Sequence, residues 1–178
     1  MDIKSKAIYA LTAATFILST PVFAGTLNGQ VAVQLTLSTG CTVSNGSSAN
    51  GVNHWGTLDF GNYADLSNAI DGSVTGTGGN GVSIICSEGL TPTLALNGGL
   101  SANQGVRNMT ANGGNIAYRL YSDTARTQAI AINGQIPLAA DGTAQNIPIY
   151  GRVLPADQTT PAPAAGTYND TVVATLAW

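Results

Sequence analysis

The chain has 178 residues, of which only 8% are charged, and its formal net charge is −3 at pH 7. So few basic residues offer no cationic patch for a phosphate backbone, which excludes a nucleic-acid partner. With a single histidine and a single glutamate, the chain also lacks the ligand clusters and acid–base pairs on which metal sites and hydrolases depend. We therefore expect no catalytic residue, no metal, no cofactor and no small-molecule substrate.

Residues 1–24 have the organisation of a secretory signal peptide. Lys4 and Lys6 form a short basic start, residues 7–18 are an apolar run, and Ala24 places a small residue at the cleavage position. The run is too short to span a bilayer. Cleavage after Ala24 would leave an exported product without lysine, which excludes polymerisation through lysine-based covalent crosslinks.

Residues 25–38 form an arm in which apolar and polar side chains alternate. Its odd positions hold Leu27, Gly29, Val31, Val33, Leu35 and Leu37. A period of two predicts a β-strand with one face to be buried and one face in water. Fully extended at about 3.3 Å per residue, residues 25–37 would reach roughly 43 Å, which is long for a strand of a small domain. The arm either completes the core of another molecule or is the first strand of a self-contained sandwich.

Cys41 and Cys86 are the only cysteines. In an exported protein they are expected to form a disulfide, which would contribute roughly 4 kcal/mol in the chain-entropy model. The alternative is a pair of buried free thiols. A metal site is disfavoured because His54 is the only histidine.

Residues 39–178 predict a single all-β domain. Seven Asn-Gly pairs, together with Asp71-Gly72 and Asp141-Gly142, favour tight turns between short strands. No segment has a helical period. The β-prone runs between the turns indicate an antiparallel sandwich or barrel, and they are residues 55–63, 82–86, 93–96, 116–121, 129–132, 147–153 and 168–178.

Two features could suggest a ligand site. Residues 76–81 satisfy the glycine pattern of dinucleotide-binding loops, but a strand is expected to follow them, whereas phosphate binding needs the amino end of a helix. His54 and Trp55 are read most simply as loop residues. A carbohydrate-binding role for Trp55 with Tyr63 is the alternative.

Several stretches together resemble the spore coat protein U family, which includes the subunits of archaic chaperone–usher pili. The stretches are the alternating arm before Cys41, the cysteine pair, and the segments 116–123 (IAYRLYSD), 150–153 (YGRV) and 166–172 (GTYNDTV) with the closing Trp178. They cover essentially the whole exported chain. The arm and the chain length further resemble the major shaft pilins of Csu-type biofilm pili.

The resemblance implies an incomplete immunoglobulin-like β-sandwich that is completed by a donor strand from a neighbouring subunit. A periplasmic chaperone would first lend the missing strand, and the arm of the next subunit would replace it at the outer-membrane usher. The odd positions of the arm would then be the donor residues. The implied acceptor or chaperone-pairing edge consists of Tyr168, Val172, Ala174, Leu176 and Trp178, four of which share one face of the last β-prone run.

The implied function is that of the structural major subunit of a bacterial surface pilus, exported through the periplasm and assembled without covalent bonds for attachment and biofilm formation. Its partners would be identical subunits, the chaperone, the usher and minor tip subunits. An arm joined to a single domain indicates a shaft subunit rather than a tip adhesin. The alternatives are a monomeric secreted binding module and an envelope or spore coat component.

Overall fold

The computed structural model describes residues 26–44, 46–49, 52–76 and 81–178. The predicted signal peptide and most of the glycine-rich segment 76–81 lie outside these residues. The chain divides into two units, one ending at Thr36 and a compact one over Leu37–Trp178. No helix among the described residues is long and apolar enough to cross a membrane.

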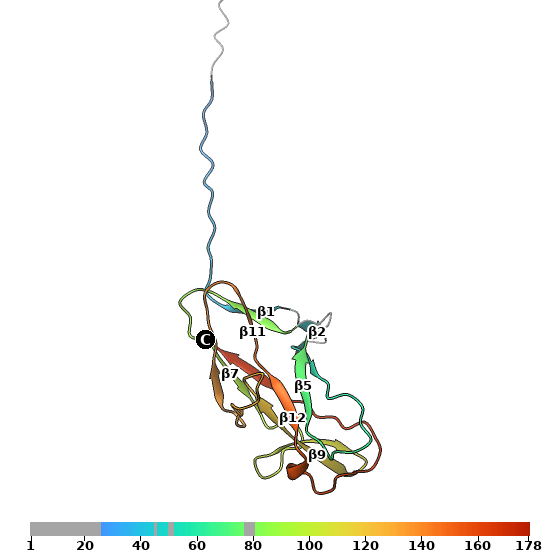
Figure 1. The fold of residues 1–178 in the computed structure, drawn as a ribbon. Coiled ribbons are helices and arrows are strands. Elements are labelled where there is room, and N and C mark those ends of the chain that lie inside the picture. Colours follow the sequence, from blue (N-terminus) through green and yellow to red (C-terminus); the bar gives the residue numbers. More distant parts are fainter. Residues whose placement is uncertain (1–25, 45, 50–51, 77–80) are drawn as a thin grey trace, which may run out of the picture. The chain divides into compact units, whose positions relative to one another are not determined.

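Residues 26–36, blue in Figure 1, contain no assigned strand. Their apolar side chains are almost fully exposed, with Leu27 at 100% and Val33 at 93%. The sequence predicts a strand here, and the structure differs because a ladder needs a second strand to receive the main-chain N–H and C=O groups. The arm has the side-chain pattern of a strand but no partner for one within the described chain.

The unit Leu37–Trp178 is all-β, with one short 3₁₀ turn at η2 (Pro155–Asp157). Among the described residues the strands are β1 (Cys41–Ser44), β2 (Ser47–Ala49), β3 (Val52–His54), β4 (Thr57–Leu58), β5 (Ile70–Thr75), β6 (Ser83–Cys86), β7 (Thr93–Leu96), β8 (Arg107–Ala111), β9 (Gly114–Tyr121), β10 (Gln135–Pro137), β11 (Ala144–Asn146), β12 (Tyr150–Val153) and β13 (Ala174–Ala177).

The strands pair in antiparallel fashion throughout. The largest sheet has the order β4-β5-β12-β9-β8, and two three-stranded sheets have the orders β1-β6-β11 and β10-β7-β13. A small hairpin, β2-β3, stands apart from them. Asn112 and Gly113 both have positive φ in the tight turn between β8 and β9, as predicted for an Asn-Gly pair.

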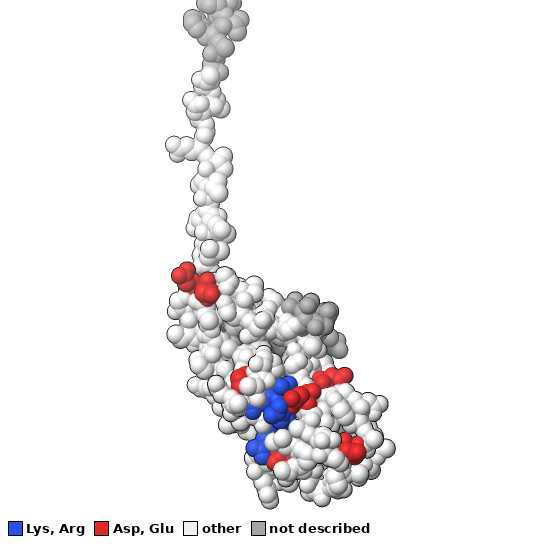
Figure 2. Space-filling model, viewed as in Figure 1, with Lys and Arg blue, Asp and Glu red and all other residues white. Residues whose placement is uncertain are grey.

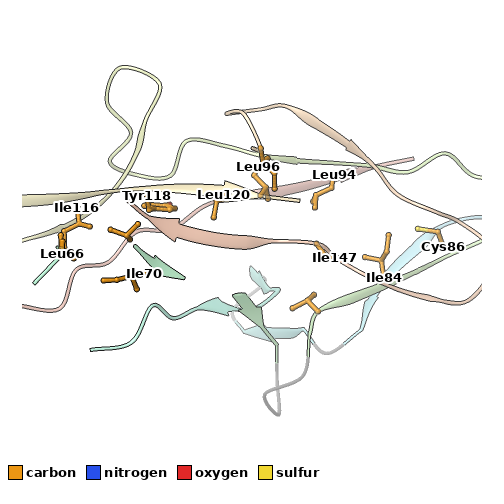
Figure 3. Close-up of a cluster of buried hydrophobic side chains, with 13 residues drawn as sticks. Leu66, Ile70, Ile84, Cys86, Leu94, Leu96, Ile116, Tyr118, Leu120 and Ile147 are labelled. Atoms are coloured by element: carbon orange, nitrogen blue, oxygen red, sulfur yellow. The ribbon is translucent and has the colours of Figure 1, made fainter. Parts of the chain in front are cut away.

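The core lies between the largest sheet and the two smaller sheets (Figure 3). Strands β5, β9 and β12 supply one side, with Tyr118, Leu120 and Val153 among the buried side chains. Strands β6 and β7 supply the other, where Ile84 and Leu94 are fully buried. Four of these five core strands overlap predicted runs, at 82–86, 93–96, 116–121 and 147–153, whereas β5 lies outside all of them.

The prediction of a strand at residues 129–132 is wrong. Only an isolated bridge between Ala129 and Tyr121 forms there, although Ile130 is buried and donates its amide to Leu120 O at 2.7 Å. The pairing stops because the next amides turn away: Asn133 donates instead to Leu96 O. Burial of a single side chain therefore does not require a continued ladder.

The pair Asp71-Gly72 is also predicted wrongly, as a turn. It lies inside β5, where Gly72 pairs with Gly151 of β12. A Cβ atom on Gly72 would come within 3.0 Å of Asp59 O and of the Leu58 side chain. Glycine is needed here for close approach between elements, not for a turn.

The tyrosine at the start of the last segment identifies the sandwich type. Tyr168 donates its hydroxyl to Ala164 O, four residues upstream, at 2.9 Å. A tyrosine that bonds back across the corner before a late strand is characteristic of immunoglobulin-like sandwiches. Together with the antiparallel sheets, this corner makes the unit an immunoglobulin-like β-sandwich.

The predicted disulfide is confirmed. Cys41 and Cys86 are directly paired residues of β1 and β6, and a bond joins their sulfur atoms. Cys86 is buried in the core, and Cys41 is half-buried at its margin. The bond ties the first strand of the domain to the central strand of its sheet.

We predict that Cys41→Ser lowers the free energy of unfolding by about 3–4 kcal/mol, because the unfolded chain gains the freedom that the crosslink removed. Urea unfolding and the steady-state amount of the protein in cells measure the effect. The double variant Cys41→Ser/Cys86→Ser is the matched control, since it removes the same bond without leaving an unpaired thiol. Normal protein levels in both variants would contradict the prediction.

Candidate functional site

Strands β1 and β13 are two of the sheet-end strands that leave one edge unpaired. Strand β1 is at the end of the order β1-β6-β11, and β13 is at the end of the order β10-β7-β13. Within the described part of the chain, nothing pairs with the outer edge of either strand. Free N–H and C=O groups along such edges are ready to accept a further strand.

A pocket of about 450 Å³ is lined by both of these strands. We call it the β1–β13 groove. Figure 1 places the C-terminus, which follows β13, close to β7, as expected from the pairing of β13 with β7. The lining residues are Cys41, Thr42, Val43, Gly46, Ser47, Asn53, His54, Trp55, Leu176 and Trp178.

The core beneath this groove is only partly covered. Val43 on β1 and Ala174 and Leu176 on β13 pack against the core cluster but remain half-exposed. On the adjacent strands, Ile84 and Leu94 are completely buried. Core-facing side chains are thus partly exposed along these two unpaired strands, while those on the strands beside them are buried, so the sandwich is incomplete at this side.

The lining of the groove includes no aspartate, glutamate, lysine or arginine. A ligand that fits it must therefore be an extended, uncharged segment. That segment must offer main-chain hydrogen bonds to the strand edges and apolar side chains at alternate positions to the open core.

The segment that leads into β13 is held by a buried hydroxyl. Tyr118 donates its hydroxyl to Asp170 Oδ2 at 2.6 Å, and Asp170 Oδ1 accepts from the amides of Leu100 and Thr171 at 2.7 and 2.8 Å. Burial, together with the hydrogen bond to Asp170, raises the pKa of Tyr118. The tyrosine therefore stays protonated as the donor.

Asn97 provides a second anchor for the same segment. The side-chain Oδ1 of Asn97 accepts from the main-chain amides of Val173 and Gly99 at 2.8 and 2.9 Å. The main-chain amide of Asn97 donates to Val173 O. These bonds begin just before β13, so they fix where the unpaired strand starts.

Arg107 stabilises the main chain around both anchors by hydrogen bonds. Its buried guanidinium donates to the main-chain carbonyls of Leu96, Asn97, Ile130 and Ala131 at 2.8–3.3 Å. Burial lowers the pKa of Arg107. Four carbonyl acceptors satisfy the charge and lock the loop after β7 onto the segment before β10.

The remaining arginines of the described chain are also engaged. Arg119 pairs with Asp157 at 2.6 Å, and Arg152 and Arg126 both approach Asp71, at 2.6 and 3.3 Å. In Figure 2 the visible basic side chains gather in one patch with acidic ones beside them, and most of that face is uncharged. This patch belongs to β5, β9, β12 and their loops, not to the β1–β13 groove.

The residues expected at the acceptor edge lie in different places in the structure. Leu176 and Trp178 line the groove, with Trp178 58% exposed, while Val172 and Ala174 pack on the core along the same strand face. Tyr168 lies in the corner before β13 and does not line the groove. A direct part for Tyr168 in strand pairing stays a prediction.

Trp55 and Tyr63 do not form a common platform. Trp55 lines the β1–β13 groove, whereas Tyr63 borders a separate pocket of about 270 Å³ with Asp65 and Asn68. No group of histidine, cysteine, aspartate and glutamate side chains suited to a metal ion occurs among the described residues.

Sequence reasoning missed the anchors Asn97 and Arg107. Asn97 precedes a glycine and therefore looks like a turn residue, while its amide group is in fact bonded to a segment far along the chain. A lone arginine in a chain with so little charge was the available signal for Arg107. Its acceptors, being main-chain carbonyls, leave no trace in the sequence.

A family model described as "Spore Coat Protein U domain" matches residues 27–175. The chain belongs to this family. A relative with which it is 31% identical over 189 aligned positions, covering 99% of both chains, is "Protein U" of Myxococcus xanthus. The fold resembles a chain in the crystal structure of the CsuC–CsuE chaperone–tip adhesion subunit pre-assembly complex from archaic chaperone–usher Csu pili of Acinetobacter baumannii.

That structural likeness has a TM-score of 0.51 at 21% sequence identity. It covers 80% of the present chain and 40% of the Acinetobacter chain, so the protein spans well under half the length of that solved chain. At this identity the likeness concerns the fold alone.

We predict that Tyr118→Phe lowers the free energy of unfolding by about 1.5–3 kcal/mol, the usual contribution of a hydrogen bond to a charged group. Urea unfolding followed by tryptophan fluorescence measures it. Tyr121→Phe on the same strand is the matched control, because no side-chain hydrogen bond of Tyr121 occurs among the described residues, and its effect should stay below about 0.5 kcal/mol. Equal effects of the two variants would show that the Tyr118 hydroxyl does not anchor the segment before β13.

Proposed function

We propose that the protein is the structural major subunit of a bacterial surface pilus. The exposed arm of one copy fills the β1–β13 groove of the next, and repetition of this contact builds the fibre. The observation that carries the proposal is the half-covered core between two unpaired strands, in a chain that also has an exposed, uncharged arm with large apolar side chains at five of the six odd positions from 27 to 37.

The chemistry of the arm fits the groove. Five large apolar side chains at its odd positions are exposed, and full burial contributes about 1.5–3 kcal/mol for each, or roughly 8–15 kcal/mol in all as an upper bound. Main-chain hydrogen bonds to both strand edges would add to this. The five are Leu27, Val31, Val33, Leu35 and Leu37.

The geometry of such a contact accounts for a fibre. Arm and groove are different surfaces of one chain, so each copy can donate in one direction and accept in the other. A contact of this heterologous type propagates as an open filament rather than closing into a dimer. Beyond residues 1–24 the chain has no lysine, which agrees with assembly without lysine crosslinks.

The exposed apolar groove indicates which assembly partners the chain would need. Before assembly an open core invites aggregation, so a periplasmic chaperone would fill it and the outer-membrane usher would exchange the chaperone for the next arm. The similar fold in a chaperone–tip subunit complex supports chaperone engagement. The presence of an arm favours the shaft over the tip, with minor tip subunits as further partners in fibres for attachment and biofilm formation.

A second candidate is a component of a spore or envelope coat. It is favoured by the family description and by the end-to-end similarity to Protein U. The same strand donation could build a coat. Electron microscopy of the exporting cell separates the two, since a pilus gives thin fibres that extend from the surface and a coat gives a continuous layer.

We predict that Val33→Asp abolishes assembly, because it would bury a carboxylate against an apolar core. Gln34→Asp is the matched control: it places the same charge at the next residue, on the face of the arm that stays in water, and should leave assembly unchanged. Cell-surface fibres and polymer ladders on gels measure both variants. Wild-type fibres from Val33→Asp would rule out the donor role of the arm.

The decisive experiment compares the exported chain with a version lacking residues 25–37, each co-produced with a candidate chaperone. Samples are run on SDS gels without boiling. Strand donation predicts a heat-sensitive ladder from the full chain and only a one-to-one chaperone complex from the truncated one. A stable monomer that needs no chaperone would instead indicate a self-contained binding module.

A further inference from the structure

The arm contains a chemically labile dipeptide, Asn28-Gly29. The side-chain amide carbon of asparagine can be attacked by the main-chain nitrogen of the next residue, and glycine obstructs this attack least because it has no Cβ. The reaction needs the asparagine side chain and the next amide to move freely toward each other. Three other Asn-Gly pairs are described in full and provide an internal comparison, at Asn97, Asn112 and Asn133.

In two of these three pairs, the reacting groups are held by hydrogen bonds. The side-chain oxygen of Asn97 accepts from the amides of Gly99 and Val173, so its amide carbon cannot turn toward Gly98. The amide of Gly134, which would be the attacking nitrogen after Asn133, donates to Ala131 O at 3.0 Å.

The third pair is held by its turn. Asn112 and Gly113 have φ values of 49° and 79° in the hairpin between β8 and β9, where Ala111 pairs with Gly114 on either side of the turn. These dihedrals are fixed as long as the hairpin is intact. Reaction at any of the three pairs therefore requires local opening of the fold.

Asn28-Gly29 has no such restraint. Both residues are exposed, they belong to no strand, and no hydrogen bond involves them among the described residues. A Cβ atom added to Gly29 would have no atom within 4 Å. Nothing within the described chain opposes the motion that the reaction needs.

We propose that Asn28 is a site of spontaneous deamidation and backbone isomerisation in the unpaired arm. The deprotonated nitrogen of Gly29 attacks Cγ of Asn28, a new C–N bond forms, and ammonia leaves with the displaced proton to give a cyclic succinimide. Water then opens the ring at one of its two carbonyls. The products are aspartate or β-linked isoaspartate, and overall one water is consumed for each ammonia released.

The consequence for assembly rests on the proposed function. Isoaspartate adds one carbon to the main chain, and a strand whose spacing is broken in this way turns the preceding side chains to the opposite face. Leu27 would then point away from the groove, while Val31 and the later apolar residues would keep their orientation. The modified arm would dock through a shortened apolar face, and a docked arm would be protected by its ladder bonds.

Peptide mapping by mass spectrometry tests the modification itself. The full exported chain is incubated as a monomer at mildly alkaline pH, and the conversion of asparagine to aspartate and isoaspartate is followed in each Asn-Gly peptide. We expect Asn28 to react at least about tenfold faster than the three folded pairs, a ratio that corresponds to a local opening free energy of only about 1.4 kcal/mol. Gly29→Ala should slow the reaction at Asn28. Equal rates at all four asparagines would overturn the proposal.

Assembly of fresh and aged samples tests the consequence. Aged wild-type chain should form fewer or less heat-resistant polymers than fresh chain, whereas Asn28→Gln, aged for the same time, should assemble like its fresh sample because glutamine cyclises far more slowly. Full assembly of extensively modified wild-type chain would refute the effect on docking. If the fresh samples also fail to assemble, strand donation itself is wrong, and the mapping result alone decides the fate of Asn28.

Discussion

The incomplete cover of the core between β1 and β13 governs the rest of this structure. A sandwich is stable when every core-facing side chain is buried and every strand edge is paired, covered or otherwise protected. Here Val43, Ala174 and Leu176 face the core but are half-exposed, and the edges beside them are free in the described chain. Hydrophobic burial and main-chain hydrogen bonding are both unsatisfied at one place, so a single extended segment can satisfy both at once.

A groove of this kind is useful only if its walls keep their positions while it is empty. Strand β1 is fixed by the disulfide to β6. Strand β13 has no crosslink, and it is held by its ladder with β7 and by the bonds that Asp170 and Asn97 make just before it begins. The few arginines of the described chain also serve this rigidity, because their hydrogen bonds and ion pairs hold loops and strands in place.

The sequence predicted the features that depend on local patterns. Alternation identified the last strand, two cysteines beside a predicted export signal identified the disulfide, and Asn112-Gly113 identified a hairpin turn. The failures came from long-range packing. Gly72 looks like a turn residue, but the approach of Leu58 and Asp59 requires a glycine within a strand.

The candidate site was likewise predictable from local patterns but not from long-range packing. The inward alternation along β13 could be read from the sequence, but the opposite wall could not, because only the tertiary fold places Val43 and Trp55 in the same pocket as Leu176. The anchors Asn97 and Arg107 escaped because a side chain bonded to distant main-chain groups has no sequence signature. Local chemistry was therefore predictable where neighbours in the chain act together, and not where the fold brings remote segments into contact.

The location of the disulfide has a mechanical consequence for a filament of the proposed kind. Tension along the fibre would pass through each arm and enter the domain at Cys41, only three residues after the arm ends at Ser38. The first folded strand would otherwise resist this pull with hydrogen bonds alone, and those bonds could open one after another from the pulled end. The covalent link to Cys86 transfers the force directly to the central strand of the sheet. Under tension, the contact between subunits should therefore yield before the domain unravels from its amino end.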